Sequence, residues 1–294
     1  SGGDLWPRVA RYAHGDDYHL VMERRLRRLG ERIEAAFPGT RSRTYVDTGP
    51  ILERELAARA GLGAIGKNTV LMHPEKGSWL LLGELLLTLE LDPDVPFADL
   101  CGSCTACLDA CPTGALPAPY RLDSRRCISY WTIEHRGNLP PEVVGSLAGW
   151  VFGCDICQEV CPVNESVRGG AEDRLRLPRH RRELDLASLL TLTREEYVER
   201  FRGSAMKRAK LEGLQRNAAA AAGASGEERY LGPLSRALEN DDPAVRSQAA
   251  GALAAVGGET ARATLENAAR REEHRAVKEA ILSSLAGFSQ PLSP

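Results

Sequence analysis

Apolar and polar positions alternate along the first third of the chain in a way that predicts both helices and strands. Between residues 16 and 37, apolar side chains recur at roughly helical spacing and arginines occupy the opposite face, which predicts an amphipathic helix. The elements expected after it are a strand over 43–48, a helix over 51–60, a strand over 70–73 and an apolar strand over 79–91. This part of the chain is therefore expected to be α/β-like.

The pattern from residue 183 onward is helical throughout. Residues 230–258 and 261–288 repeat each other with a period of about 31–32 residues, and Asp242-Pro243 is typical of a helix start. Paired helices of this period indicate short HEAT-like repeats. Because two repeats cannot form an independent solenoid, we expect them to pack on the helices that precede them.

Composition narrows the class of protein without identifying it. The chain has 294 residues, 43% of them hydrophobic and 27% charged, with a formal net charge of −2. These values are ordinary for a soluble globular protein of two or three domains, and no global basic field indicates nucleic acid. No apolar run is long enough to span a membrane and no signal peptide is visible. The eight cysteines must stay reduced if they bind metal clusters, so a cytoplasmic protein is expected. The start Ser1-Gly2-Gly3 lacks an initiator methionine, so either residues precede this sequence or a tag scar remains.

All eight cysteines belong to one pattern. The first run is Cys101-x2-Cys104-x2-Cys107-x3-Cys111-Pro112, Cys127 stands alone, and the second run is Cys154-x2-Cys157-x3-Cys161-Pro162. The first run has the spacing of bacterial two-cluster ferredoxins, in which the fourth cysteine binds the other cluster. This rule predicts two [4Fe–4S] clusters: one held by Cys101, Cys104, Cys107 and Cys161, the other by Cys111, Cys127, Cys154 and Cys157. Zinc and disulfides are the alternatives, but zinc sites usually combine two C-x2-C pairs, and disulfides need an oxidising compartment.

A glycine-rich segment matches one nucleotide-binding motif and nearly matches a second. Gly61-x-Gly63-x-x-Gly66 matches a dinucleotide fingerprint, and Gly61-x4-Gly66-Lys67 nearly matches a P-loop. Both motifs require a strand directly before the glycines, whereas a helix is expected there, and Asn68 replaces the Ser or Thr that binds Mg²⁺. The segment is therefore interpreted either as a turn that packs closely or as one that lets the backbone approach a larger cofactor.

The order of motifs resembles a known family. RYAHGDDYH is followed by YVDTGPILERELAARAGLGAIGKNT, GSWLLLGELLLTLEL, the two cysteine runs flanking CISYWTIEHRG, and MKRAKLEGLQRNAAAAAG. The cysteine runs alone are not specific, but VDTGPILER, GSWLLLGEL and CISYWTIE together resemble the epoxyqueuosine reductases, cobalamin-dependent enzymes of the last step of queuosine synthesis in tRNA. The resemblance covers nearly the whole chain, although family members usually begin well upstream of RYA.

The resemblance implies an α+β chain of four parts. They are a partial cobalamin-binding α/β domain over 1–95, a ferredoxin-like domain with two [4Fe–4S] clusters over 96–165, a basic helical segment over 166–226 and HEAT-like repeats over 227–294. It also implies base-off cobalamin, reduced through the clusters to Co(I), which opens the epoxide of epoxyqueuosine. The electrons would come from a low-potential donor such as ferredoxin or flavodoxin.

Asp47 is the catalytic residue that the resemblance implies. It matches the proton-donor aspartate of VDTGP, where it would protonate the alkoxide that forms as the epoxide opens. Such an acid must hold its proton near neutral pH, which burial against the corrin would favour. A turn residue, or a cap for the helix beginning near Ile51, is the structural alternative.

The expected cofactor contacts lie beside the ligands of the second cluster, because electron transfer requires short distances. Ser129 and Asp155, next to Cys127 and Cys154, are expected to bind corrin amides, although Ser129 could instead hydrogen-bond a cluster sulfur or the backbone. The complete set of residues expected to contact cobalamin is Ser129, Cys154, Asp155, Gly77 and Leu71.

Basic residues are expected to bind the phosphates of a tRNA that carries epoxyqueuosine in its anticodon loop. The set is Arg136, Lys207, Arg208, Lys210 and Arg216, and a second basic stretch covers 174–182. A solvated helix face is the alternative for such a charge run. Tyr130 or Trp131 could stack on the extruded base, but core packing is equally compatible with either.

Two other functions fit parts of the sequence. Reductive dehalogenases also combine cobalamin with two four-iron clusters, but the basic, HEAT-like C-terminal region argues against that class. A non-catalytic ferredoxin-like electron carrier, or a scaffold that binds tRNA, would need neither Asp47 nor a corrin pocket.

Overall fold

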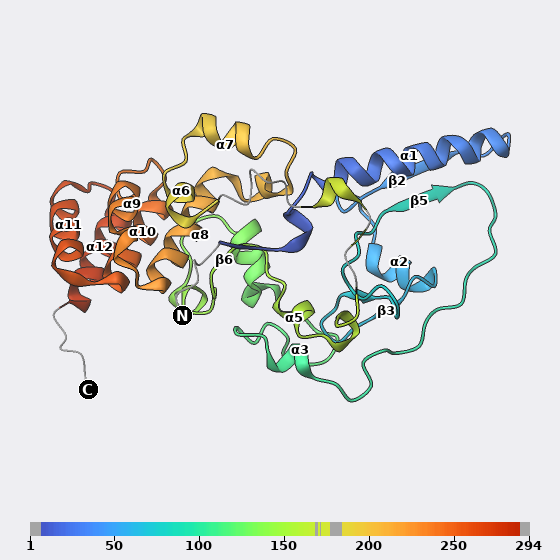
Figure 1. Cartoon of the computed structure of the whole chain (residues 1–294), viewed down its shortest axis with the longest axis horizontal. Helices are drawn as coiled ribbons and strands as arrows, with labels where there is room; N and C mark the ends of the chain where they lie inside the picture. The colour runs from blue at the N-terminus through green and yellow to red at the C-terminus, as the bar shows by residue number, and fades with distance from the viewer. Residues whose placement is uncertain (1–6, 168–169, 171, 177–183, 289–294) are drawn as a thin grey trace.

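The computed structural model describes residues 7–167, 170, 172–176 and 184–288 (Figure 1). The chain is elongated, with the C-terminal helices at one end, the long N-terminal helix and its strands at the other, and the short helices of the cysteine region between them (Figure 1). Within the described part, no helix is both long enough and apolar enough to cross a membrane.

The N-terminal end is built on one long helix and a two-stranded ladder. Helix α1 (Tyr18–Ala36) confirms the amphipathic helix predicted over 16–37, and the Asp17 carboxylate caps it by accepting the His19 N–H. Strand β2 (Ser42–Tyr45) pairs antiparallel with β5 (Glu84–Leu87). The His19 Nε2 atom lies 3.2 Å from the Oδ2 atom of Asp47, two residues after β2, so the first residues of α1 lie near the end of this ladder.

The apolar strand predicted over 79–91 is shorter than expected. Only the four residues of β5 form a ladder, because β2 offers four partners and ends where Asp47 turns the chain with a φ of 57°. A strand cannot extend beyond the backbone that supplies its hydrogen bonds. Helix α2 (Glu53–Arg59) and strand β4 (Leu71–Met72) lie where the pattern predicted them. Strand β3 (Ala64–Ile65), which pairs with β4, was not predicted, because it lies within the glycine-rich segment.

Among the described residues, the strands form only two-stranded ladders, so the α/β-like part lacks the larger sheet that its pattern suggested. The third ladder joins regions distant in sequence: β1 (Arg8–Val9) runs parallel to β6 (Trp150–Phe152). The N-terminal segment is thereby attached directly to the cysteine region.

The cysteine region is made of short elements. One-turn helices α3 (Ala106–Asp109) and α5 (Ile156–Glu159) lie inside the two cysteine runs. The other short helices here and nearby are α4 (Pro141–Val144), the π-helix η3 (Tyr130–Glu134), and the 3-10 turns η1 (Arg11–Ala13), η2 (Ser124–Arg126), η4 (Pro162–Asn164) and η5 (Asp173–Leu175).

The C-terminal part is entirely helical in its described residues, as its pattern predicts. Its elements are α6 (Leu186–Leu190), α7 (Arg194–Arg200), η7 (Ala205–Ala209), α8 (Lys210–Ser225), η8 (Glu228–Tyr230), α9 (Leu231–Ala237), α10 (Pro243–Val256), α11 (Gly258–Arg271) and α12 (Arg275–Gly287).

Helix α8 is the centre of this part and is buried along most of its length. Its small residues let α10 approach closely: a Cβ added at Gly223 would lie 2.6 Å from the Ala252 Cα atom. The repeats therefore pack on the preceding helix, as predicted. At the opposite face, the Asn217 side chain donates to the carbonyls of Thr132 and Val151, both at 2.8 Å, and ties α8 to the cysteine region.

Candidate functional site

All eight cysteines have free thiols, which fall into two neighbouring sets. Burial raises the pKa of Cys107, and the nearby thiols of Cys101 and Cys161 raise it further. Burial also raises the pKa of Cys161, which lies near Cys101 and Cys104. These four residues are the ones that the spacing rule joins in the first cluster.

The second set is more deeply buried. Burial raises the pKa of Cys154 and of Cys157 to about 12 each, and both thiols are close enough to Cys127 and Cys111 to be raised further by them. Cys157 also lies within electrostatic range of Cys107, so the two sets are adjacent. Which thiols bind each cluster stays a prediction, but the chain brings together the members that the interleaved assignment requires.

The surroundings of the thiols fit anionic sulfur clusters. The backbone N–H groups of Lys67 and Ala115 point to the Sγ atoms of Cys101 and Cys111, each at 3.3 Å. Hydrogen bonds to sulfur, net charge and solvent exposure are what set the reduction potential of such clusters.

Asp47 lies at the centre of a group of ionisable side chains. It follows β2 in a left-handed conformation with φ 57°, which is uncommon outside glycine but is tolerated best by Asn and Asp. Its Oδ2 atom is 3.2 Å from the His19 Nε2 atom, and Tyr18 also hydrogen-bonds its carboxylate. The Asp47 side chain is 58% exposed. Strained backbone that presents a reachable acid is typical of functional loops.

The alternative that Asp47 caps the next helix does not hold. Helix α2 begins after Leu52 and has no side-chain cap. Instead, the Asp47 N–H donates to the Glu53 Oε1 atom at 2.5 Å, so the first residue of α2 holds the Asp47 backbone. The sequence did not predict this hydrogen bond, because no sequence pattern shows that the turn at Asp47 folds back onto the start of α2.

His19 and the tyrosines connect this group to the rest of the chain. Burial lowers the pKa of His19, but hydrogen bonds to Asp17 and Asp47 outweigh it, so the pKa lies above its usual value. Burial raises the pKa of the Tyr12 phenol, and both Asp47 and Asp155 raise it further. Tyr12 therefore lies within electrostatic range of both carboxylates.

Glu53 is itself paired with a second carboxyl group. Burial raises the pKa of Glu84 to about 7, and the charge of Glu53 and a hydrogen bond between the two carboxyls add to the shift. The Glu84 Oε2 atom is buried without a hydrogen-bond partner. Two carboxyls in contact share a proton readily, because they cannot both ionise without repulsion.

We expect Glu84→Gln to change the pH dependence of stability. A carboxyl whose pKa is raised on folding costs stability as pH rises from about 4.5 to about 7, because the folded state must release a proton that the unfolded state has already lost. The variant's Tm relative to the parent chain should therefore be higher at pH 8 than at pH 5.5, as measured by thermal unfolding. An equal Tm difference at both pH values would contradict the shared proton, and Glu90→Gln on the exposed loop is the control.

The residues expected to contact cobalamin occupy different environments. Asp155 is 4% exposed, and its Oδ2 atom accepts the Arg11 N–H at 2.7 Å, while burial raises its pKa to about 6. Ser129 is half-buried at the start of the π-helix η3. Gly77 and Leu71 are buried by protein: a Cβ at Gly77 would collide with Asn164, and Leu71 is 2% exposed in the β3–β4 hairpin.

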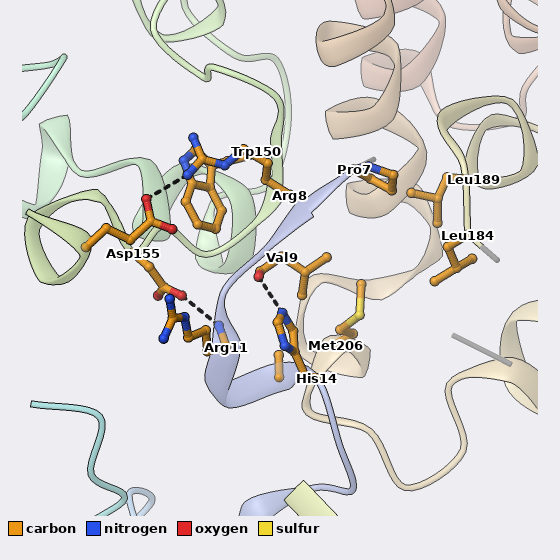
Figure 2. Close-up of a pocket in the computed structure, with 12 residues that line it drawn as sticks. Pro7, Arg8, Val9, Arg11, His14, Trp150, Asp155, Leu184, Leu189 and Met206 are labelled. Atoms are coloured by element: carbon orange, nitrogen blue, oxygen red, sulfur yellow. Dashed lines mark hydrogen bonds and ion pairs between the residues drawn. The ribbon is translucent and has the colours of Figure 1, made fainter. Parts of the chain in front are cut away.

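A small cavity lies beside Asp155 and is distinct from the Asp47 group. Its volume is about 250 Å³, and Figure 2 shows it between β1 and the apolar residues Leu184, Leu189 and Met206. The polar groups in its wall are paired: the Arg8 guanidinium lies over the Trp150 ring and binds Glu159, and the Arg11 N–H binds Asp155. Ligand pockets usually hold about 300–1,000 Å³, so this cavity is too small for a corrin.

Four of the five predicted phosphate contacts are exposed: Arg136, Lys207, Arg208 and Lys210. The Arg208 guanidinium binds Glu134 at 2.8 Å, and its pKa is raised chiefly by Glu134 and further by Asp47 and Tyr12. The basic segment of η7 and α8 therefore lies within electrostatic range of Asp47. In the second basic stretch, Arg174 and Arg176 form ion pairs with Asp16 and Asp173, whereas residues 177–182 lie outside the described part.

Arg216, the fifth predicted contact, does not face solvent. It is 2% exposed, and its guanidinium donates to the carbonyls of Trp131, His135 and Gly137 at 2.8, 3.1 and 2.7 Å. Burial lowers its pKa to about 10. The reason is structural: Arg216 lies on the buried face of α8 and supplies donors to a loop whose carbonyls have turned inward.

We expect Arg216→Met to lower the free energy of unfolding by about 2–4 kcal/mol, because three carbonyls lose the charged donor that the buried guanidinium supplies. Denaturant unfolding will measure the loss. Arg202→Met, at an exposed position before η7, should change stability by less than about 0.5 kcal/mol. Equal unfolding midpoints for the two variants would contradict the interior role of Arg216.

Family models match three parts of the chain. A model described as a 4Fe-4S double cluster binding domain matches residues 100–164, one described as epoxyqueuosine reductase QueG, DUF1730 matches 5–48, and one described as HEAT repeats matches 200–286. The cysteine region is therefore a double [4Fe–4S] cluster domain rather than a zinc or disulfide module, and the helical pairs are HEAT-like.

Curated relatives and solved structures agree with these models. Epoxyqueuosine reductase from Gloeobacter violaceus is 46% identical over 225 residues (75% of this chain and 70% of the relative), and that from Xanthomonas campestris is 44% identical over 253 residues (85% and 70%). A crystal structure of epoxyqueuosine reductase with an epoxyqueuosine-modified tRNA-Tyr stem loop matches with a TM-score of 0.90 and 32% identity, over 97% of this chain and 78% of that one.

The Bacillus subtilis enzyme, solved with its catalytic aspartate loop swung out of the active site, matches with a TM-score of 0.92 and 31% identity, over 98% of this chain and 78% of that one. These matches extend from the N-terminal segment through the cysteine region to the HEAT-like helices. The chain belongs to the epoxyqueuosine reductase family of oxidoreductases.

Proposed function

We propose that this chain reduces epoxyqueuosine to queuosine at the wobble position of tRNA, the last step of queuosine synthesis, using two [4Fe–4S] clusters, cobalamin and Asp47 as proton donor. The observation that carries this proposal is the position of Asp47, a reachable acid on a left-handed turn. Asp47 lies within electrostatic range of Arg208 in the basic segment and of Tyr12, which Asp155 beside the cysteines also influences. The four parts over 1–95, 96–165, 166–226 and 227–294 are proposed as the corresponding domains.

The two sets of thiols support the electron relay. We assign one cluster to Cys101, Cys104, Cys107 and Cys161 and the other to Cys111, Cys127, Cys154 and Cys157, in agreement with their neighbours in the fold. Because the sets are adjacent, electrons from a donor such as ferredoxin or flavodoxin can pass between them one at a time. Such clusters reach potentials several hundred millivolts negative, as reduction of cobalamin requires.

The residues near Asp155 fit the edge of a corrin in their chemistry. The ring carries amide groups that both donate and accept hydrogen bonds, and Asp155 and Ser129 supply an acceptor and a hydroxyl beside the second set of thiols. Gly77 and Leu71 would contribute through backbone groups. The Leu71 side chain is buried in the protein, and there is no space for a side chain at Gly77. Cobalamin, when bound, supplies a reduced cobalt nucleophile that can open an epoxide.

Residues of the chain supply a proton to the epoxide oxygen. Converting the epoxide to the alkene takes two electrons and two protons and releases one water. Asp47 is proposed to donate to the epoxide oxygen as the ring opens, because it is the exposed acid of the group. His19, held by Asp17 at 2.7 Å, lies 3.2 Å from the Asp47 Oδ2 atom and orients the Asp47 carboxyl. Glu53 fixes the backbone of the turn.

The relative solved with a modified tRNA stem loop supports a tRNA substrate for this chain. Lys207, Arg208, Lys210 and Arg136 are proposed to bind phosphates around the anticodon loop, and Tyr130, which is 38% exposed, is the better placed aromatic side chain for stacking. The Trp131 side chain is held within the protein, because its Nε1–H donates to the Arg125 carbonyl at 2.7 Å.

We expect the double change Lys207→Ala and Lys210→Ala to weaken tRNA binding and to reduce its salt dependence. Each lost phosphate contact lowers the slope of log K against log salt by about 0.7–0.9, so two contacts lower it by about 1.4–1.8. Binding isotherms at several salt concentrations will measure the slope. Lys278→Ala, on the exposed side of α12, should leave it unchanged. An unaltered slope in the double variant would exclude these lysines from the interface.

The function is tested by anaerobic reconstitution. The purified chain is loaded with iron, sulfide and cobalamin, supplied with a low-potential reductant and tRNA that contains epoxyqueuosine, and the digested nucleosides are analysed by mass spectrometry. Conversion to queuosine that depends on cobalamin supports the proposal. Conversion without cobalamin would remove its role, and cobalamin-dependent turnover of small organohalides in place of tRNA would favour the dehalogenase alternative. Cluster loading with no turnover of either substrate would favour the electron carrier.

A further inference from the structure

The lysine of the glycine-rich segment is bound to the first cysteine loop. Lys67 is 9% exposed, and its Nζ atom donates to the carbonyls of Gly102 at 2.6 Å and Cys104 at 2.9 Å. Its backbone N–H points to the Cys101 Sγ atom at 3.3 Å. The segment therefore does not act as a P-loop, because the Lys67 ammonium donates to protein carbonyls and not to a phosphate.

The neighbours of Lys67 along the chain also contact the cysteine region. The Asn68 side chain donates to the Cys157 carbonyl at 3.3 Å, and the Met72 Sδ atom lies 3.8 Å from the Cys161 Sγ atom. The segment from Lys67 to Met72 therefore contacts two thiols of the first set and a backbone carbonyl of the second. Of the residues in it, only Lys67 is charged, and its charge lies beside the first set.

Charged side chains lie beside both sets of cysteines. Asp99 also faces the first loop, where its carboxylate accepts the N–H groups of Cys101 and Gly102, but it is exposed and its charge is screened by water. The buried Lys67 ammonium is screened much less. The second set has the buried Asp155 directly after Cys154.

A cluster gains negative charge when it is reduced, so a buried cation next to it stabilises the reduced form and raises the potential. We propose that Lys67 is a positioning residue that raises the reduction potential of the cluster at Cys101, Cys104, Cys107 and Cys161 above that of its neighbour. This rests on the proposed cluster assignment. The first cluster then accepts an electron from the donor before the second, and it serves as the entry and storage site of the relay.

The test is a redox titration of the reconstituted protein, followed by electron paramagnetic resonance without cobalamin or tRNA. The parent chain should show two one-electron waves. Lys67→Met should move the higher wave to more negative potential and leave the lower one in place. Lys67→Gln keeps N–H donors for the two carbonyls without the charge and should shift the same wave. Lys67→Arg, which keeps the charge, should titrate close to the parent chain, as should Lys76→Met in the exposed turn nearby.

The outcomes separate the two proposals. Unshifted waves in both the Met and Gln variants, or equal shifts of both waves, would overturn the role of Lys67 while leaving the two clusters established. If the Lys67→Met variant fails to load iron, the higher wave of the Lys67→Gln variant tests the role of the Lys67 charge. A parent chain that binds no clusters would overturn the proposed function, and the role of Lys67 with it.

Discussion

Replacing Asp47 with asparagine will lower the rate of queuosine formation by about 100- to 10,000-fold, the range typical of a lost general acid. Asparagine has nearly the same shape and tolerates the left-handed φ of 57° at this position. It also keeps a side-chain oxygen for His19 and Tyr18. The variant therefore removes the transferable proton with little change to the turn, and single-turnover assays with modified tRNA will measure the rate.

The same variant has readouts that distinguish proton transfer from structure. Iron content, cluster absorbance and tRNA affinity should match the parent chain, so kcat falls while KM changes little, as expected when an interaction of the transition state is lost. Asp92→Asn, on the exposed loop between β5 and the first cysteine run, is the matched control and should turn over normally. An Asp47→Asn variant with full turnover would show that the proton comes from another group or from water.

The features predicted best from sequence are those in which covalent spacing or periodicity determines the outcome. The cysteine runs predicted a double cluster domain because ligation permits few spacings, and the helix predicted over 16–37 was confirmed within two residues at each end as α1. The strand predicted over 79–91 is longer than the observed β5, because the length of β5 depends on β2, which is distant in sequence and ends at Tyr45.

The features that sequence could not predict depend on what surrounds a charge. Arg216 reads as part of a basic surface in MKRAKLEGLQRN, yet inward-facing carbonyls from residues 131–137 make its burial possible. The sequence argued against a phosphate-binding role for Lys67 but did not show that it binds the carbonyls of the first cysteine loop. In both cases the partners are backbone groups far along the chain, which no side-chain pattern records.

The second large effect concerns the interleaved clusters. Cys111→Ala alone and Cys154→Ala alone should each reduce the iron content from about eight to about four atoms per chain and abolish turnover, since each removes a ligand of one four-iron cluster. The double variant should also keep about four iron atoms, because Cys111 and Cys127 are neighbours of Cys154 in the fold and are assigned to the same cluster.

Combining Cys154→Ala with Cys161→Ala provides the matched contrast. Cys161 neighbours Cys101 and Cys104, so this double variant disables both clusters and should bind almost no iron. If the clusters instead followed the order of the chain, with Cys101 to Cys111 in one and Cys127 to Cys161 in the other, the two results would be exchanged. In that case the double variant at Cys111 and Cys154 would lose all its iron, and the double variant at Cys154 and Cys161 would keep half. Iron and sulfide analysis therefore decides between interleaved and sequential ligation by which double variant retains a cluster.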